Sequence, residues 1–229
     1  GLAEVVIVIV YRLLIRLSLH PVCTLKGTIP PGPFFANSRL SASDLSIVSK
    51  WDTSATLFSY LNVFIDEPPK WLNSPITGDR TGSKLEPWWK ISDFDDSVGD
   101  IKLIWEQSRM NWVVAFAQRA RNGDEGSLKR LNYWLSDWIE SNPPYLGPNW
   151  KCGQEASIRV MHLCSAALIL GQERDSLLGL QELIRLHLRR IAPTIHYAVA
   201  QNNNHGTSEA AALFIGGSWL TALGALDGE

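Results

Sequence analysis

The stretch "QNNNHGTSEAA", residues 201–211, brings amide and imidazole side chains together at the start of the apolar run "AAALFIGG". The run predicts a helix, and one asparagine is enough to cap its first turn. Three consecutive asparagines and His205 exceed that need. Side-chain donors at a helix N-terminus are suited to an anion, because backbone N–H groups and the helix dipole favour negative charge there. The pattern therefore indicates an anion site with Asn203, Asn204 and His205, and a plain helix cap is the alternative. Glu209 is a further candidate for substrate binding.

A second polar cluster lies in "GDIKLIWEQSR", where Trp105, Glu106 and Arg109 fall within one helical turn. Glu106 and Arg109 are spaced to form an ion pair, worth about 0.2–0.5 kcal/mol if it is exposed. A solvated pair of this kind is one interpretation. The other is that the three residues bind a sugar, because the flat indole face of tryptophan is suited to stacking on sugar rings.

A third cluster lies in "NPPYLGPNWKCGQEASIR", where a turn brings Asn149 and Trp150 to the start of a predicted helix. Glu155 and Arg159 follow at a spacing of four residues, which favours an ion pair on the helix surface. The functional interpretation is a sugar subsite, with Trp150 as the stacking platform and the polar side chains as partners of hydroxyl or carboxylate groups. The alternative is a capped helix that carries a surface ion pair.

The remaining composition argues against several other classes of site. The net charge of −2 gives no electrostatic signal for nucleic-acid binding. Three cysteines form no CxxC pair, no two histidines have the HExxH spacing, and "SDFDDSVGD" does not meet the calcium-loop pattern. The sequence thus predicts no metal site and no cofactor.

The first hundred residues are expected to pack on the later part of the chain, which contains the three polar clusters. Residues 1–21 predict an amphipathic helix, whose apolar run falls short of the roughly 20 residues of a membrane span. The segment makes a poor signal peptide, so the compartment stays open between the periplasm and the cytoplasm of a bacterium. Residues 41–52 predict a short helix or loop, and residues 55–65 predict one or two short strands. A long loop rich in proline and tryptophan follows to residue 99.

From residue 100 onward the apolar spacing predicts successive helices, which gives an all-α fold. Short turns between helices favour antiparallel hairpins. Repeated hairpins form either a solenoid or a closed ring, and the absence of a fixed repeat disfavours a solenoid. The expected helices cover residues 100–124, 125–142, 147–171 and 175–201, the last with a kink at Pro193, and a fifth helix starts after His205.

Several motifs together resemble the N-terminal part of the heparinase II/III-like polysaccharide lyases, a group that includes alginate lyases. They are "WLNSPITG", "PWWKISDFD", "GDIKLIWEQSR", "LSDWIESNPPYLGPNWKCGQEASIRV" and "NNNHGTSEAAALF", in this order. The resemblance extends roughly from Trp51 to Phe214. The resemblance implies an incomplete (α/α) toroid of helical hairpins followed by a β-sandwich. We expect residues 1–99 to pack on the toroid, residues 100–229 to supply its first hairpins, and the rest of the toroid and the β-sandwich to lie outside this chain.

The resemblance also implies β-elimination on an acidic polysaccharide that contains uronic acid. A base removes the proton at C5, the C4–O bond breaks, and the negative carboxylate must first be neutralised. In the family an asparagine or histidine in a stretch similar to "NNNH" has this role. The resemblance therefore assigns the role to Asn204 and His205, with Asn203 beside them. The catalytic tyrosine and second histidine of the family fall after Glu229, so we expect this chain to be inactive alone.

Two other functions remain open from the sequence. A glycoside hydrolase on a helical toroid would need two carboxylates across a cleft, and the candidates are Glu106, Glu155 and Glu209. A helical domain without chemistry could bind carbohydrate or assist polysaccharide biosynthesis, since a resemblance indicates fold more firmly than reaction.

Overall fold

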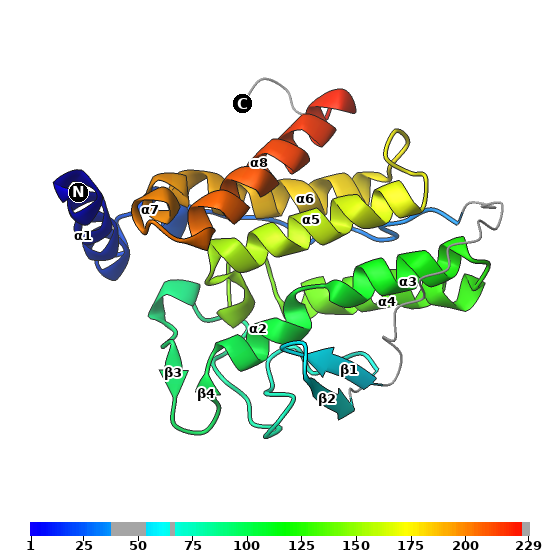
Figure 1. The fold of residues 1–229 in the computed structure, drawn as a ribbon, viewed down its shortest axis with the longest axis horizontal. Helices are drawn as coiled ribbons and strands as arrows, with labels where there is room; N and C mark the ends of the chain where they lie inside the picture. Colours follow the sequence, from blue (N-terminus) through cyan, green and yellow to red (C-terminus); the bar gives the residue numbers. More distant parts are fainter. Residues whose placement is uncertain (38–53, 65–66, 226–229) are drawn as a thin grey trace.

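The computed structural model describes residues 1–37, 54–64 and 67–225. The predicted short helix or loop at residues 41–52 lies outside the described residues. Helices dominate the described chain, and two small antiparallel sheets accompany them, so the all-α prediction is confirmed at the level of class (Figure 1).

The centre of the molecule consists of two helical hairpins stacked on each other (Figure 1). The first pairs α3 (Asn111–Arg121) with α4 (Glu125–Ser141), and the second pairs α5 (Gly153–Ile169) with α6 (Leu178–Ile191). Helix α5 contacts α3 on one side and α6 on the other, so it links the two layers. This arrangement confirms the prediction of antiparallel hairpins.

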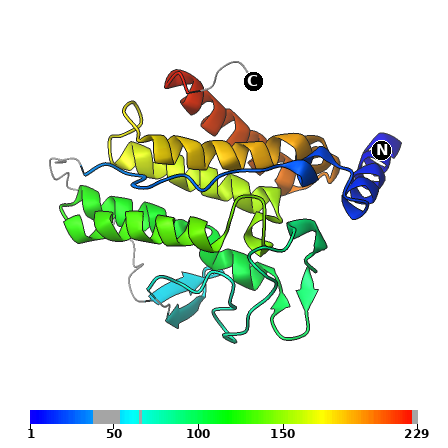
Figure 2. The same cartoon turned by 180° about the vertical axis from the view of Figure 1, so that it is seen from behind.

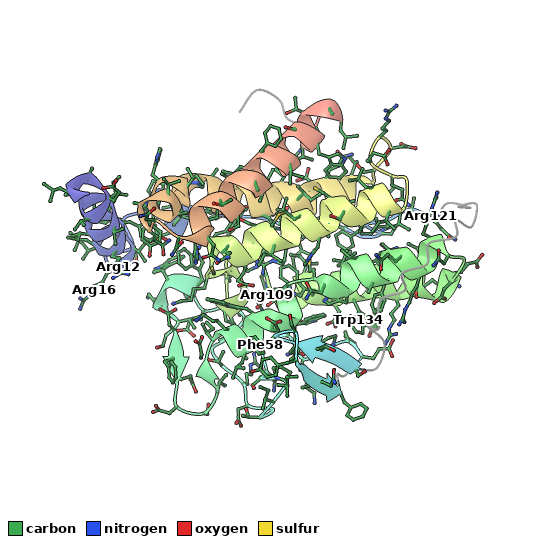
Figure 3. The ribbon with its side chains drawn as sticks, viewed as in Figure 1. Arg12, Arg16, Phe58, Arg109, Arg121 and Trp134 are labelled. Carbon is green, nitrogen blue, oxygen red and sulfur yellow. The ribbon has the colours of Figure 1, made fainter. Side chains whose placement is uncertain are left out.

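Buried tryptophan side chains fill much of the core around these hairpins. Trp112, Trp134, Trp138 and Trp150 are fully buried, and Trp112 and Trp134 pack edge to face with ring centroids 5.3 Å apart. Trp134, labelled in Figure 3, also packs on Trp71 of the loop before α2, with ring centroids 6.1 Å apart. Each buried aromatic side chain stabilises the fold by roughly 1.5–3 kcal/mol relative to exposure. The apolar residues that share one face of α4 are all buried: Leu131, Trp134, Leu135, Trp138 and Ile139.

The prediction of a single helix over residues 100–124 is wrong, because the structure has two helices there, α2 (Lys102–Ser108) and α3. Met110, at the break, has a φ of 64°, which is left-handed and interrupts helical hydrogen bonding. Its side chain is fully buried. Apolar spacing continues across the break, because both helices bury their apolar faces in the same body. Periodicity alone therefore could not show where one helix ended.

The predicted kink at Pro193 is confirmed. Helix α6 is followed by the 3-10 turn η4 (Ala192–Thr194) and then by α7 (Ile195–Ala200). A short turn leads from α7 into α8 (Asn204–Ala222), which crosses α5 and α6 obliquely (Figure 1). The start of α8 thus lies beside the end of α7, where Gly206 approaches Val199, and beside the start of α5, where Glu209 approaches Gly153.

The N-terminal segment packs along the helical body. Helix α1 (Leu2–Arg16) docks on α7, where the rings of Tyr11 and Tyr197 stack with centroids 3.7 Å apart. After η1 (Pro21–Thr24), residues 25–37 run without helix along the hairpins (Figure 2). Asn132 on α4 accepts hydrogen bonds from the backbone of Phe34 and Phe35, which ties this segment down. No helix of the described residues is long and apolar enough to cross a membrane.

The described residues from β1 to the start of α2 form the lower part of the molecule in Figure 1. Strands β1 (Ser54–Leu57) and β2 (Leu61–Phe64) pair antiparallel, which confirms the short strands predicted there. The rest is mostly loop, as predicted, with the 3-10 turn η2 (Trp88–Lys90) and the small hairpin of β3 (Phe94–Asp95) and β4 (Gly99–Asp100). Turn η2 contacts α1 and so closes one side of the region in front of α8.

Candidate functional site

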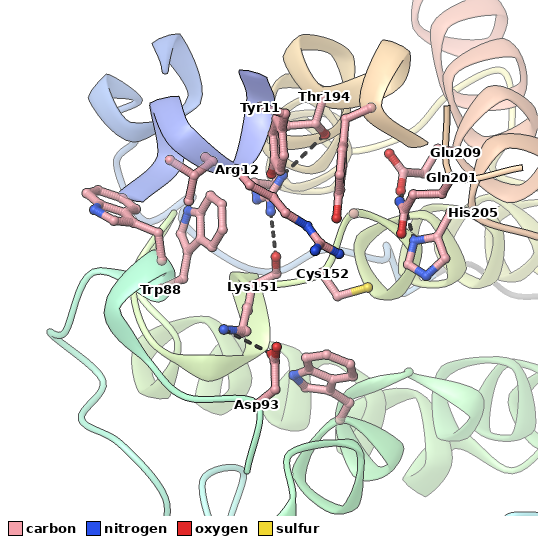
Figure 4. Close-up of a pocket in the computed structure, with 16 residues that line it drawn as sticks. Tyr11, Arg12, Trp88, Asp93, Lys151, Cys152, Thr194, Gln201, His205 and Glu209 are labelled. Carbon is pink, nitrogen blue, oxygen red and sulfur yellow. Dashed lines mark hydrogen bonds and ion pairs between the residues drawn. The ribbon is translucent and has the colours of Figure 1, made fainter. Parts of the chain in front are cut away.

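A cleft opens where α1, α2, α7 and the starts of α5 and α8 meet (Figure 4). It consists of two adjoining cavities, the inner one of about 480 Å³ and the outer one of about 580 Å³. The two cavities share four lining residues: Asp93, Trp105, Cys152 and His205. His205 therefore lies at the junction of the two cavities, and volumes of this size are typical of small-molecule sites.

The start of α8 separates the capping asparagine from the residues that face the cleft. Asn203 is the N-cap, and its side-chain oxygen accepts a hydrogen bond from the backbone N–H of His205 at 2.9 Å. Asn202 has a φ of 50° and makes the tight turn before it. Asn204, which is exposed, and His205 both line the outer cavity. Capping thus occupies Asn203, which lines neither cavity, and leaves Asn204 and His205 for binding.

Glu209 lies one helical turn after His205 and is almost fully buried. Its Oε1 is 3.4 Å from His205 Nδ1, whereas its Oε2 has no hydrogen-bond partner within the described residues. A Cβ atom on Gly153 would lie 2.7 Å from this carboxylate, so only glycine leaves room for it. A protonated His205 can donate from Nδ1 to Glu209 and from Nε2 to a ligand in the cleft. Glu209 is therefore placed to orient the imidazole.

Aromatic and basic side chains form the wall of the inner cavity opposite His205. Tyr11 and Arg12 come from α1, Tyr197 from α7, and Trp88 from η2. Burial raises the pKa of Tyr11 to about 12, so its hydroxyl is neutral and can donate a hydrogen bond. Tyr11, labelled in Figure 4, stacks on Tyr197, and both rings line the cavity.

Two further cations at the cleft are held by the protein itself. Arg190 is 1% exposed, donates to the carbonyl oxygens of Trp150 and Lys151 at 2.8 and 2.6 Å, and stacks on Trp88. Lys151 forms an ion pair with Asp93 at 3.0 Å. Because Arg190 has carbonyl partners rather than a carboxylate, its charge adds to the positive potential at the floor of the inner cavity.

Cys152 is the thiol of the cleft, where it lines both cavities. Burial raises its pKa to about 11, so at neutral pH it is a neutral thiol rather than a thiolate nucleophile. Within the described residues, no group of three or more His, Cys, Asp or Glu side chains is arranged to hold a metal ion. The chemistry that this cleft presents is hydrogen bonding, stacking and positive charge.

Glu106, Arg109 and Glu155 form one closed ion-pair cluster between α2 and α5. Arg109, labelled in Figure 3, makes two hydrogen bonds of 2.8 Å to the two oxygens of Glu155. It makes a third to Glu106. The backbone N–H of Phe58 also donates to Glu106. Glu106 and Glu155 are buried and Arg109 is partly buried, so the solvated-pair interpretation is wrong. Arg109 and Glu155 line the outer cavity, whereas Glu106 lines neither cavity.

The predicted surface pair of Glu155 and Arg159 is also wrong, because Arg159 is fully buried. Its Nε donates to His187 Nε2 at 2.9 Å and its Nη2 donates to the carbonyl oxygen of Asn149 at 2.7 Å. Burial lowers the pKa of Arg159 to about 10, which leaves it charged at neutral pH. The pKa of His187 lies well below its ordinary value, because burial and Arg159 disfavour its charged form.

Asn149 and Trp150 are fully buried beside Arg159, which leaves them no surface for a sugar. Asn149 Nδ2 donates to the carbonyl oxygen of Trp71 at 3.0 Å, and Trp150 Nε1 donates to that of Asn142 at 3.0 Å. These bonds anchor the turn before α5 to the core. The predicted subsite built on Asn149, Trp150 and Arg159 is therefore a structural cluster, and we remove all three from the candidate site.

Trp105 keeps a place in the candidate site. It lines both cavities with 8% of its surface exposed, and its Nε1 donates to the carbonyl oxygen of Pro148 at 2.9 Å. That bond fixes the indole at the junction of the cavities. Only its exposed part can contact a ligand, so Trp105 forms part of the wall rather than an open stacking platform.

The sequence analysis missed the residues that α1 and α7 contribute to the cleft, chiefly Tyr11, Arg12 and Tyr197. One signal for Arg12 was present, because it interrupts an otherwise apolar helix. Nothing in the sequence showed that α1 docks on α7, almost 190 positions further along. The contribution of α1 depends on tertiary contacts that local patterns do not encode.

Comparisons with protein-family models, with curated proteins and with solved structures found no match to this chain.

Proposed function

We propose that the cleft binds a uronic acid unit of an acidic polysaccharide, with Asn204 and His205 neutralising its carboxylate. The observation that carries this proposal is the position of these two residues at the N-terminus of α8, on the wall of a cleft. The amide of Asn204, the imidazole of His205 and the positive end of the helix dipole all favour a carboxylate there. Trp105 and the Tyr11–Tyr197 pair offer aromatic surface for the sugar rings.

In this proposal the chain belongs to a polysaccharide lyase that acts by β-elimination. Neutralising the carboxylate makes the adjacent C5 proton easier to remove, since the negative charge that develops is spread onto a group already held by donors. A preorganised donor of this kind contributes about 2.7–4 kcal/mol to transition-state stabilisation in comparable sites. The base and the acid come from the family's tyrosine and second histidine, which match no residue of this chain. The hairpins of α3 to α6 would then be part of an (α/α) toroid.

The glycoside hydrolase alternative is less consistent with the cleft. A hydrolase needs two carboxyl groups that face each other across the substrate. Arg109 holds both Glu106 and Glu155, and Glu209 is buried behind His205. Asp93 of the inner cavity is paired with Lys151. The carboxylates of the described cleft are thus engaged by the protein rather than arranged as an acid and a base.

Binding of uronate oligosaccharides to the 229-residue chain tests the first step. We expect measurable binding by calorimetry to an unesterified oligogalacturonate, oligomannuronate or oligoguluronate, and we expect methyl esterification to abolish it. His205→Ala and Asn204→Ala should each weaken binding by about 10- to 100-fold, because each removes a donor to a charged group. Equal binding of the ester and the acid would show that the cleft does not recognise a carboxylate.

Product analysis tests the reaction in a protein that joins this chain to the family's remaining catalytic residues. A lyase gives unsaturated sugar ends, which absorb in the ultraviolet. New reducing ends without this absorbance would indicate a hydrolase, and binding without any turnover would indicate a carbohydrate-binding or biosynthetic accessory domain.

A further inference from the structure

Arg12 differs from the other cations of the cleft, because it makes no hydrogen bond or ion pair within the described residues. Arg109 is held by Glu106 and Glu155, and Lys151 is paired with Asp93. Arg190 is bound to backbone carbonyl oxygens. The exposed guanidinium of Arg12 is therefore available to an anion that enters the cleft.

The position of Arg12 follows from the docking of α1. Its neighbour Tyr11 stacks on Tyr197 with ring centroids 3.7 Å apart, and this contact fixes the rotation of the helix. The Arg12 side chain extends from α1 into the inner cavity and points toward Cys152 (Figure 4). Arg16 lies on the same helix one turn later, is exposed, and lines neither cavity.

The inner cavity therefore has two places for an acidic group. Arg12 lies on the wall formed by α1, and His205 lies on the wall formed by α8. Both face the same volume of about 480 Å³, so few sugar units can separate the groups that they bind. Arg190, buried at the floor and bonded to the backbone carbonyl oxygens of Trp150 and Lys151, adds positive charge between the two walls.

We propose that the cleft binds consecutive uronic acid units, with one carboxylate at Asn204 and His205 and the carboxylate of a neighbouring unit at Arg12. This inference rests on the proposed function and narrows its substrate class to polyuronates. A polysaccharide in which uronic acid alternates with an uncharged sugar has no carboxylate on the neighbouring unit. Arg12 would then have no anionic partner, and the cleft would favour the polyuronate.

Calorimetry with Arg12→Gln and the matched control Arg16→Gln tests this inference. The probes are unesterified tetrasaccharides of galacturonate, mannuronate and guluronate, and a hyaluronan tetrasaccharide as the alternating polymer. For the polyuronate that binds the wild-type chain most tightly, we expect Arg12→Gln to weaken binding about 10-fold or more. Arg16→Gln should bind like the wild type, and hyaluronan binding should be weaker and insensitive to both substitutions. Both positions are exposed, so thermal stability should stay unchanged.

Different results overturn the two proposals. Equal polyuronate affinity of Arg12→Gln and Arg16→Gln, with His205→Ala still weakened, would overturn the role of Arg12 and leave the carboxylate site at His205 intact. Hyaluronan binding as tight as polyuronate binding would overturn the preference for consecutive units. Failure of the wild-type chain to bind any of these acidic probes would overturn both the proposed function and this inference.

Discussion

Two polar clusters, each built around a histidine, lie within the same set of helices and differ mainly in their exposure. In the core cluster, His187 on α6 accepts a hydrogen bond from Arg159 on α5, and Trp150 packs on both. In the cleft cluster, His205 on α8 contacts Glu209 and shares the wall with Trp105. Members of the core cluster are fully buried, whereas 25% of the His205 side chain is exposed.

The comparison teaches that residue types alone do not separate a binding site from a structural network. Arginine, histidine, asparagine and tryptophan occur together in the core cluster as they do in sugar-binding sites. There most of their polar atoms bond one another or the backbone of the turn before α5, as expected because a buried polar group without a partner is costly. Only Asn149 Oδ1 and Arg159 Nη1 of this cluster have no hydrogen-bond partner within the described residues. In the cleft cluster the donors of Asn204 and His205 face open volume instead.

The largest expected effect is the loss of stability on replacing Trp150 by alanine. Its side chain is fully buried and its Nε1 donates to the carbonyl oxygen of Asn142, so we expect a destabilisation of about 3–5 kcal/mol. Urea unfolding followed by circular dichroism measures this change. His205→Ala is the matched substitution in the cleft cluster and should unfold nearly like the wild type. A Trp150→Ala variant of normal stability that had lost sugar binding would reverse the assignment of the two clusters.

A smaller loss of stability should follow from Gly153→Ala, because Gly153 on α5 packs against Glu209 of the cleft cluster. The added Cβ would lie 2.7 Å from the Glu209 carboxylate and must displace it. Overpacking of this kind costs about 1–3 kcal/mol, and the shift should also disturb His205. We expect lower stability together with weaker binding of uronate oligosaccharides. The control is Gly217→Ala on α8, where a Cβ meets no atom within 4 Å, so neither property should fall.

Substitution of Asn203 should lower stability, whereas substitution of the neighbouring Asn204 should weaken binding. Asn203→Ala removes the cap of α8 and should lower stability by about 1 kcal/mol. Asn204→Ala leaves the cap intact and should weaken uronate binding without that loss. Thermal unfolding and calorimetry on both variants measure the two properties separately. If Asn203→Ala instead weakened binding with no change in stability, the division between cap and site at the start of α8 would be wrong.

The smallest expected effect is the dependence of stability on mild acid. The pKa of His187 in the folded chain is lowered well below its ordinary value of 6.5 by burial and by Arg159. The unfolded chain therefore takes up the proton first, and stability is fully present above about pH 6.5 and falls as the pH drops toward the folded-state pKa. His187→Gln should reduce the slope of unfolding free energy against pH. His20 and His162, whose pKa values are also lowered, remain to give the residual slope.

An unchanged slope in His187→Gln would mean that the core histidine does not carry the acid sensitivity. His205→Ala is the comparison variant for this measurement, because it removes a histidine from the cleft cluster and leaves the core one in place. It should retain the acid-dependent slope that His187 contributes.

Local patterns in the sequence were enough to predict much of the fold. Apolar spacing located α4, α5 and α6, the kink at Pro193 and the start of α8. Aromatic and β-branched residues at positions 55–65 located the short strands β1 and β2. The break at Met110 was missed because the apolar faces of α2 and α3 both point into one body, so their spacing runs on across the left-handed residue.

For the candidate site, the sequence predicted some residues correctly and assigned others the wrong partner. Asn204 and His205 were identified because their polarity exceeds what a helix cap requires, and both line the cleft. Glu155 was expected to pair with Arg159, four residues away on its own helix, but it pairs with Arg109 on α2. A spacing rule compares only residues of one helix, whereas a buried carboxylate takes the best-placed cation from any helix that packs against it.

The sequence by itself determined the local features of this protein: where most helices begin and end, which side of α4 is apolar, and that one asparagine of three caps α8. Only the tertiary structure decided which polar clusters face solvent and which residues join them. Propensity, capping and periodicity act over a few neighbouring residues, so they are encoded locally. Burial depends on which helices pack together, and the docking of α1 on α7 brings Arg12 opposite His205 from the other end of the chain.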